Sequence, residues 1–401
     1  MKKRISVALS FLMLLCVLTC TAVAYAEGDE LAQVTGLKSG GTTATAITVK
    51  WDETENAEGY YVSLYKPETK KEAHYTTTDT TYKAVKLRWS TKYTFKVRAY
   101  KTVDGVKTYG EYSEALKIST KDVVAKPAVS GYCNLTSKPV VTWKKAKSAK
   151  KYVVYRSTKK DKGYKKIATL GEKARSYTDK SAKVHKTYYY KVRGWRKFSG
   201  QNAFSKYSAA VAIKAKKTVF VGDSVMEGVK LYNGIPGATY ISKVGMGPYT
   251  FYENNYFSAG GAQVSGCEKL ISLKPDRVFF MLGMNEIHYK SDKGVIEYYS
   301  YALEDLFESR KNVEVIILSA PPTKANSGST IAKKPRLKKY NAAQKKMAQK
   351  YGCAYYDFTA PFKDSNGYLL DKYDGGDGCH WNTSSAKLFG KQMLKYAKSH
   401  K

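Results

Sequence analysis

Cysteine is scarce in this chain, with 6 cysteines among 401 residues. So few cysteines exclude a miniprotein that depends on a dense set of disulfide bonds. No group of cysteines and histidines has the spacing of a zinc site. Hydrophobic residues make up 43% of the chain, which is enough for folded cores and excludes disorder throughout.

Long hydrophobic runs are scarce as well, and the one that occurs lies at the N-terminus, from Ile5 to Val23. Basic residues precede it and Ala24-Tyr25-Ala26 follows it, which predicts a secretory signal peptide over residues 1–26. An uncleaved membrane anchor is the alternative, because the run approaches the roughly 20 residues that a span needs. No later segment is apolar enough to span a bilayer, so we expect a secreted, extracellular chain without a transmembrane segment after cleavage.

Residues 30–121 and 122–216 form a self-similar pair. Their common features recur 92 to 95 residues apart, which suits a duplicated small domain better than a solenoid repeat. Each copy has short alternating strands separated by turn residues, which is typical of a β-sandwich. The matching features are an early tryptophan, a tyrosine-rich strand and a closing Tyr-Ser pair: Trp51 and Trp143, Tyr93–Tyr100 and Tyr188–Trp195, Tyr112-Ser113 and Tyr207-Ser208.

This pair resembles fibronectin type III modules, and the resemblance covers both copies. We therefore name residues 30–121 module 1 and residues 122–216 module 2. The resemblance implies that four aromatic residues pack in the cores between the sheets instead of binding a ligand: Trp51, Trp143, Tyr93 and Tyr188.

Acidic residues are few, 34 against 69 basic residues, and the imbalance is concentrated in module 2. Residues 27–120 hold 14 basic and 13 acidic residues, whereas residues 121–216 hold 26 and 4, a net charge of +22. One interpretation is a solvated surface that keeps the chain soluble. The other is attachment to an anionic cell-wall polymer, with the protein associated with the wall. Nucleic acid is a poorer partner, because nothing in the sequence indicates base readout.

From residue 217 to residue 401 the pattern changes to apolar runs that alternate with amphipathic segments. The runs predict buried strands at 219–221, 277–281, 313–318 and 354–358, with a further strand ending at Val244. The amphipathic segments predict helices at 292–311, 335–351 and 384–399. This alternation indicates an α/β domain with a parallel sheet and helices on both faces.

Polar residues follow these strands, at the edge of the sheet where active sites of open α/β folds collect. Ser224 follows the first strand at a strand-to-helix turn, and Asp377 and His380 precede the last helix. The serine needs a base to become a nucleophile, which His380 can supply, and Asp377 can orient that imidazole. The backbone N–H groups of Ser224 and Gly245 and the side-chain amide of Asn285 can stabilise an oxyanion. Asn285 as a simple cap remains an alternative.

The domain resembles the SGNH, or GDSL, hydrolases, which share a flavodoxin-like sheet. Three of the family's blocks appear in order, as Gly222-Asp223-Ser224 with Gly228, Gly283-x-Asn285-Glu286, and Asp377-x-x-His380. Glu286 stands where aspartate is commoner in the family. For the second block, Gly245 is the expected oxyanion glycine and Gly247 is the alternative. The resemblance implies ester hydrolysis with neither a metal ion nor a cofactor.

Taken together, these features predict a secreted serine esterase that removes O-acetyl or other short acyl esters from a cell-wall or extracellular glycan. A surface-binding or adhesion protein with a non-catalytic hydrolase-like domain is the first alternative. A lipase or lysophospholipase is the second, weakened by the lack of an obvious apolar lid. For Trp381, which follows the histidine, packing and a sugar-binding platform are equally open.

Overall fold

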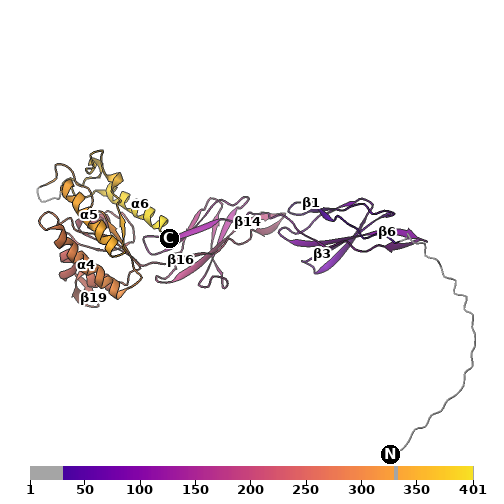
Figure 1. The fold of residues 1–401 in the computed structure, drawn as a ribbon, viewed down its shortest axis with the longest axis horizontal. Coiled ribbons are helices and arrows are strands. Elements are labelled where there is room, and N and C mark those ends of the chain that lie inside the picture. Colours follow the sequence, from indigo (N-terminus) through magenta and orange to yellow (C-terminus); the bar gives the residue numbers. More distant parts are fainter. Residues whose placement is uncertain (1–29, 329–332, 401) are drawn as a thin grey trace, which may run out of the picture. The chain divides into compact units, whose positions relative to one another are not determined.

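The computed structural model describes residues 30–328 and 333–400, which fold into two compact units that divide after Asp122 (Figure 1). The predicted signal peptide, residues 1–26, lies outside the described residues. Among the residues that the structure describes, no helix is both long and apolar enough to cross a membrane.

The first unit holds module 1, which is a sandwich of two antiparallel sheets. The smaller sheet has the strand order β1-β2-β5. The larger sheet has the order β4-β3-β6-β7, and in it β8 also pairs with β6. The alternation along β6 explains the sandwich, because Tyr93, Phe95 and Val97 are buried while Lys92 and Lys96 are exposed. The strands are β1 Lys38–Thr42, β2 Ile47–Lys50, β3 Gly59–Lys66, β4 Lys71–Thr77, β5 Thr81–Ala84, β6 Lys92–Val103, β7 Val106–Tyr109 and β8 Leu116–Ser119.

Module 2 belongs to the second unit and repeats the strand order of module 1. Its sheets are β13-β10-β9 and β12-β11-β14-β15, with β16 beside β14. The expected core residues Trp143 and Tyr188 are buried, as are Trp51 and Tyr93 in module 1. The strands are β9 Val129–Cys133, β10 Pro139–Trp143, β11 Lys151–Ser157, β12 Lys165–Gly171, β13 Ser176–Thr178, β14 Thr187–Phe198, β15 Gln201–Phe204 and β16 Val211–Lys214.

The rest of the second unit is the α/β domain, built on a parallel sheet with the order β18-β17-β21-β22-β23. Its strands are β17 Thr218–Gly222, β18 Thr239–Ser242, β21 Arg277–Met281, β22 Glu314–Leu318 and β23 Ala354–Tyr356. A small hairpin is formed by β19 Phe257–Ala259 and β20 Ala262–Val264. The helices are α1 Ser224–Leu231, α2 Pro248–Glu253, α3 Gly266–Ser272, α4 Asp292–Ser309, α5 Lys334–Lys350 and α6 Thr383–Ser399, with short 3-10 turns at Ala360–Phe362 and Asp371–Tyr373.

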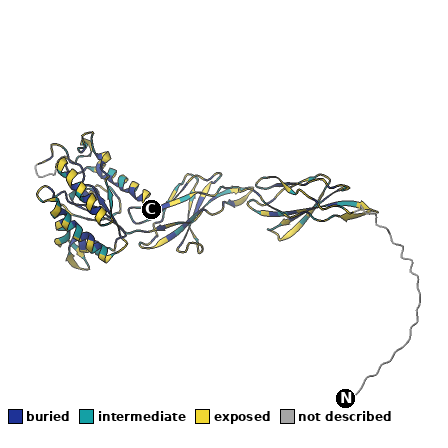
Figure 2. Cartoon of the chain, in the orientation of Figure 1, coloured by how far each residue is buried: buried dark blue, intermediate teal, exposed yellow. Residues whose placement is uncertain are grey.

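The sheet is buried on both faces, as its apolar strands predict. Along β17, Phe220 packs with α1 and α6, whereas Val219 and Val221 pack on the opposite face with α3 and α4. Figure 2 shows the helices buried on the side that faces the sheet and exposed on the other. These observations confirm the predicted fold class, which is two β-sandwiches followed by an α/β domain with a parallel sheet.

Several expected boundaries were wrong by two residues: the strand expected at 354–358 ends at Tyr356, and the helix expected at 292–311 ends at Ser309. The second strand of the sheet was expected to end at Val244, but β18 ends at Ser242. The chain then turns, because the backbone N–H of Met246 donates to the carbonyl of Lys243 at 3.2 Å. Val244 and Gly245 are consequently exposed in this turn, and are not part of the sheet.

Within the second unit, module 2 and the α/β domain share a cluster of ion pairs around Asp276. This carboxylate is 3% exposed, and it pairs with Lys214 of β16 and with Arg310, each at 2.9 Å. His185 of module 2 lies 2.7 Å from the same carboxylate. Burial alone would raise the pKa of Asp276, but hydrogen bonds from Lys214, from the backbone at Lys217 and from Arg310 outweigh it and lower that pKa.

Candidate active site

Ser224 stands where the buried strand β17 gives way to helix α1. Asp223 is the N-cap of this helix, and its Oδ1 atom accepts a hydrogen bond from the backbone N–H of Val225 at 3.0 Å. Gly222 makes the turn possible, since a Cβ atom there would lie 2.4 Å from Cβ of Met226. The helix can therefore start directly at the end of the strand, with Ser224 as its first residue.

The structure brings His380 and Asp377 to this serine, as the sequence predicts. Nε2 of His380 lies 2.8 Å from Oγ of Ser224, across 156 positions of the sequence. Nδ1 of His380 lies 2.5 Å from Oδ2 of Asp377. If Nδ1 carries the proton and donates it to Asp377, Nε2 is free to accept from the serine hydroxyl.

The loop before α6 fixes the carboxylate of Asp377. Its Oδ1 atom accepts backbone hydrogen bonds from Cys379 at 2.9 Å and from His380 at 2.8 Å. Partial burial alone would raise the pKa of Asp377, but the hydrogen bonds from the His380 side chain and from these two backbone groups lower it to about 2. The carboxylate is thus ionised at neutral pH and can stabilise a charged imidazole.

The carboxyl group of Asp223, next to the serine, has a raised pKa, in contrast to that of Asp377. Its side chain is 1% exposed, and its Oδ2 atom is buried without a hydrogen-bond partner in the structure. Burial raises the pKa of Asp223 to about 7, against hydrogen bonds and the nearby His380 that lower it. Two carboxyl groups near one histidine therefore differ in charge state near neutral pH, and Asp377 is the one that is firmly ionised.

Asn285 lies beside the segment that carries the two candidate glycines. Its Nδ2 atom donates to the carbonyl of Met246 at 3.2 Å, so the amide is held against the residue between Gly245 and Gly247. Asn285 does not cap the helix that follows, because the N-cap of α4 is Ser291.

The two glycines differ in what surrounds them. Gly245 has a φ of +79°, is exposed, and a Cβ atom there would meet nothing within 4 Å. Gly247 is buried beneath Glu286, where a Cβ atom would clash with the carboxyl group. The backbone N–H of Gly247 already donates to Oγ1 of Thr250 at 2.9 Å, whereas Gly245 lies in an exposed turn, which favours Gly245 of the two as an oxyanion donor.

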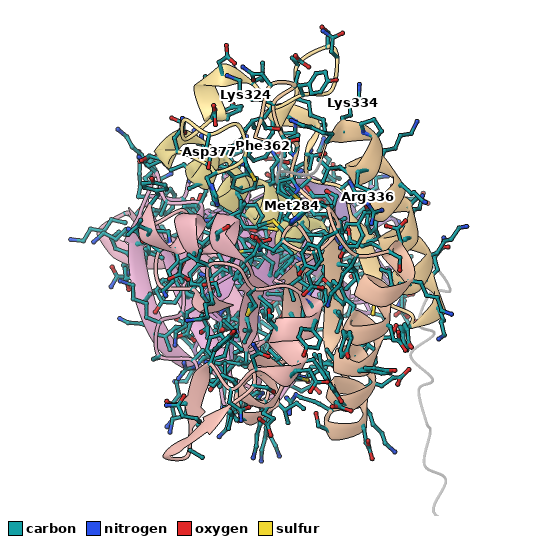
Figure 3. All side chains as sticks on the ribbon, turned by 90° about the vertical axis from the view of Figure 1, so that its left-hand side faces the viewer. Met284, Lys324, Lys334, Arg336, Phe362 and Asp377 are labelled. Carbon is teal, nitrogen blue, oxygen red and sulfur yellow. The ribbon has the colours of Figure 1, made fainter. Side chains whose placement is uncertain are left out.

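Glu286 and Lys324 are supporting residues to which the sequence analysis gave no role. Oε1 of Glu286 accepts a hydrogen bond from the backbone N–H of Tyr249 at 3.2 Å, and burial raises the pKa of this carboxyl group. The backbone N–H of Lys324 donates to the carbonyl of Gly378 at 2.8 Å, in the loop of the histidine. Figure 3 shows Lys324 and Asp377 at the same edge of the domain, above Met284. The position of Glu286 beside Asn285 was the available signal for the first residue, and nothing marked the second.

Three neighbours of the site are packing or surface residues. Trp381 is 2% exposed and stacks on Phe362 with ring centroids 5.0 Å apart, so it is no platform for a sugar. Cys379 is buried in a cluster with Met284, and it is a free thiol, like the other cysteines that the structure describes. His288 is exposed, with its ring against that of Tyr289.

A parallel sheet with a serine, a histidine and an aspartate joined beyond its strands is the architecture of a hydrolytic α/β enzyme. Residues 220–388 match the family model of the GDSL-like lipase/acylhydrolases, and residues 32–116 match that of the fibronectin type III domain. The chain therefore contains an ester hydrolase domain of the GDSL-like type, and a fibronectin type III domain before it.

Solved structures resemble the two parts separately. A GDSL-like lipase from Bacteroides thetaiotaomicron is 16% identical, with a TM-score of 0.37, over 46% of this chain and 88% of that one. A two-domain fibronectin type III segment of chicken tenascin is 17% identical, with a TM-score of 0.24, over 45% of this chain and 98% of that one. A comparison with curated proteins gave no match.

Proposed function

We propose that the chain is a secreted serine esterase that removes O-acetyl or other short acyl groups from a cell-wall or extracellular glycan. The observation that carries the catalytic part is the unbroken contact from Ser224 through His380 to Asp377, with separations of 2.8 and 2.5 Å. This geometry lets the imidazole remove the serine proton and lets the carboxylate stabilise the imidazolium that results.

In the first half of the reaction, Oγ of Ser224 attacks the ester carbonyl while its proton moves to Nε2 of His380. The bond between the carbonyl carbon and the alcohol oxygen then breaks, and the imidazolium gives its proton to the leaving alkoxide. In the second half, a water molecule loses a proton to His380 and attacks the acyl-enzyme. The acid is released and Ser224 regains its proton.

Three donors are proposed for the oxyanion of both tetrahedral intermediates. The backbone N–H of Ser224 lies in the first turn of α1, where it has no partner inside the helix. The backbone N–H of Gly245 belongs to the exposed turn after β18, whereas that of Gly247 is engaged by Thr250. Asn285 uses one amide hydrogen on the carbonyl of Met246, which leaves the second for the substrate. Loss of one such donor typically slows the reaction about 10²–10³-fold.

The openness of the site supports a short acyl group on a large alcohol. The side chains of His380 and Asp377 are 48% and 49% exposed, so a polymer can approach the serine from solvent. A long acyl chain would instead gain from an enclosed apolar channel. Secretion and location at the cell wall are part of the proposal, and they rest on the signal peptide predicted for residues 1–26.

The test is hydrolysis of p-nitrophenyl acetate by the purified protein beside Ser224→Ala, His380→Ala and the matched control His288→Ala. We expect the first two variants to lose most activity, and the control to keep it because the exposed ring of His288 packs against Tyr289. A p-nitrophenyl ester series from acetate to palmitate tests chain length, with the acetate expected to give the highest kcat/KM. Equal activity of Ser224→Ala and the parent would overturn the mechanism, and a preference for long chains would overturn the substrate class.

A further inference from the structure

Module 2 carries a row of cations and aromatic rings on the outer face of its larger sheet. Alternation along the strands buries one set of side chains, such as Tyr152 and Val154 of β11, and turns the next set outward. The pairing register then aligns the outward residues of three strands. We call them the ladder face: Lys151 and Tyr155 of β11, Lys166 of β12, and Lys191, Arg193 and Trp195 of β14.

Cations of the ladder face are in contact with aromatic rings on this face or beside it. The guanidinium of Arg193 lies between two rings, 4.7 Å from the centroid of Phe204 and 4.5 Å from that of Tyr207. Lys151 lies 4.9 Å from the ring of Trp195. These cation–π contacts keep the positive charges and the aromatic rings next to one another.

No carboxylate balances this surface in the five described strands of the sheet, since β11, β12, β14, β15 and β16 contain neither aspartate nor glutamate. Of the four acidic residues of module 2, Asp179 is buried against Arg156 and Glu172 pairs with Lys150. The corresponding sheet of module 1 differs, because Glu72 of β4 is present there and bonds Ser63. The strands of this sheet therefore lack the carboxylate that the corresponding sheet of module 1 has, and Asp161 lies outside them, in the turn between β11 and β12.

We infer that the ladder face binds an acidic polysaccharide, with sugar rings stacked on the aromatic side chains and carboxylate or phosphate groups paired with the lysines and Arg193. Tyr207 is 43% exposed and offers a ring to solvent at the edge of this face. A single-stranded nucleic acid has similar complementarity, but it carries no carboxylic ester for the α/β domain to cleave. An acylated acidic polysaccharide supplies both the anionic groups and the ester.

This inference rests on the proposed function only for the choice of a glycan, and it is tested by binding alone. Binding is measured in the Ser224→Ala background, so that the probe stays intact, against polygalacturonate, dextran, oligothymidylate and phosphatidylglycerol vesicles. The triple variant Lys151→Gln, Lys166→Gln and Lys191→Gln removes three charges from the ladder face. The control Lys71→Gln, Lys83→Gln and Lys117→Gln removes three exposed lysines from module 1.

We expect the parent to bind polygalacturonate in a salt-sensitive manner and to leave dextran unbound. The ladder variant should weaken this binding about tenfold, the control less than about twofold, and Tyr207→Ala about threefold with no change of charge. Equal losses in the two triple variants, an unaffected Tyr207→Ala, no binding, or tighter binding to oligothymidylate or vesicles would each overturn the inference. An active esterase that fails to bind refutes this inference alone, and a binder without activity refutes the proposed function alone.

Discussion

Glu286 lies directly over Gly247, so closely that a Cβ atom on the glycine would lie 2.2 Å from Oε1 of the carboxyl group. Glu286 is 2% exposed and cannot move aside into solvent. It also holds the first turn of α2 through the backbone N–H of Tyr249. The segment that carries the proposed oxyanion donor Gly245 is thus positioned by the buried carboxyl group of Glu286, which packs on Gly247, two residues after the donor.

Gly247→Ala should destabilise the protein more than Gly245→Ala. The first variant forces a methyl group against a buried carboxyl group, and we expect the free energy of unfolding to fall by about 2–3 kcal/mol. The second adds a methyl group to open space and leaves only the strain of a left-handed backbone, about 1 kcal/mol. Urea unfolding of both variants measures the difference. A larger loss for Gly245→Ala would contradict the packing described for Gly247.

Asp377→Asn should slow turnover while the affinity for substrate stays nearly unchanged. The amide can still face the imidazole, but it no longer stabilises the imidazolium, and it can hold the wrong tautomer. We expect kcat to fall roughly 10³-fold, with KM within about a factor of three. Steady-state kinetics on p-nitrophenyl acetate separates the two parameters. A loss confined to KM would mean that Asp377 binds substrate and does not act on His380.

The same carboxylate has a defined effect on stability at acid pH. Its folded pKa of about 2 lies below the ordinary value of 3.8, so its stabilising contribution is complete above pH 3.8 and is lost as the pH falls towards 2. As the pH is lowered, Asp377→Asn should therefore begin to unfold at the same pH as the parent or at a higher one. Its free energy of unfolding should then fall less steeply than that of the parent in this range. Since Asp377 is half exposed, solvent screens the effect and we expect it to be small.

The fold and the central site residues could be predicted from the sequence because they depend on local pattern. A strand such as Thr218–Gly222 is apolar throughout, and a parallel sheet places the residues after its strands at one edge. The hairpin at Phe257–Ala259 and Ala262–Val264 escaped prediction, since its three-residue strands bury almost nothing. The turn after β18 also escaped, because a backbone hydrogen bond from Met246 decides it.

Contacts between distant segments could not be predicted in the same way. Trp381 beside the histidine could have faced the substrate, and its burial depends on Phe362, which reaches it only in the folded chain. Lys324 has no motif around it, yet it bonds the loop of His380. Such residues can be assigned only once the folded neighbours are known.

Lys324→Met should loosen the loop of the histidine without unfolding the domain. The ammonium group of Lys324 lies 2.9 Å from Asp371 and 3.6 Å from Asp374, both in the segment before Asp377. The backbone bond to Gly378 survives the substitution, so we expect the free energy of unfolding to fall by less than about 1 kcal/mol. We expect kcat to fall about threefold to tenfold, because a small displacement of the imidazole weakens catalysis. Lys338→Met, an exposed lysine of α5, is the control and should match the parent.

Asp276→Ala should be the most destabilising of the substitutions considered. It removes the buried carboxylate shared by Lys214, Arg310 and His185, and because these three side chains are partly exposed we expect a loss of about 3 kcal/mol, the lower end of the range for a buried ion pair. Because its folded pKa is lowered, Asp276 stabilises the protein fully above its ordinary pKa of 3.8, and this contribution is lost as the pH falls below that value. Thermal unfolding at neutral pH and near pH 3 measures both effects, with Asp161→Ala in the exposed β11–β12 turn as the control.

Since Asp276 joins β16 to the α/β domain, we expect module 2 and that domain to unfold together in the parent. Separate transitions of the parent, or an Asp276→Ala protein as stable as the control, would contradict this coupling.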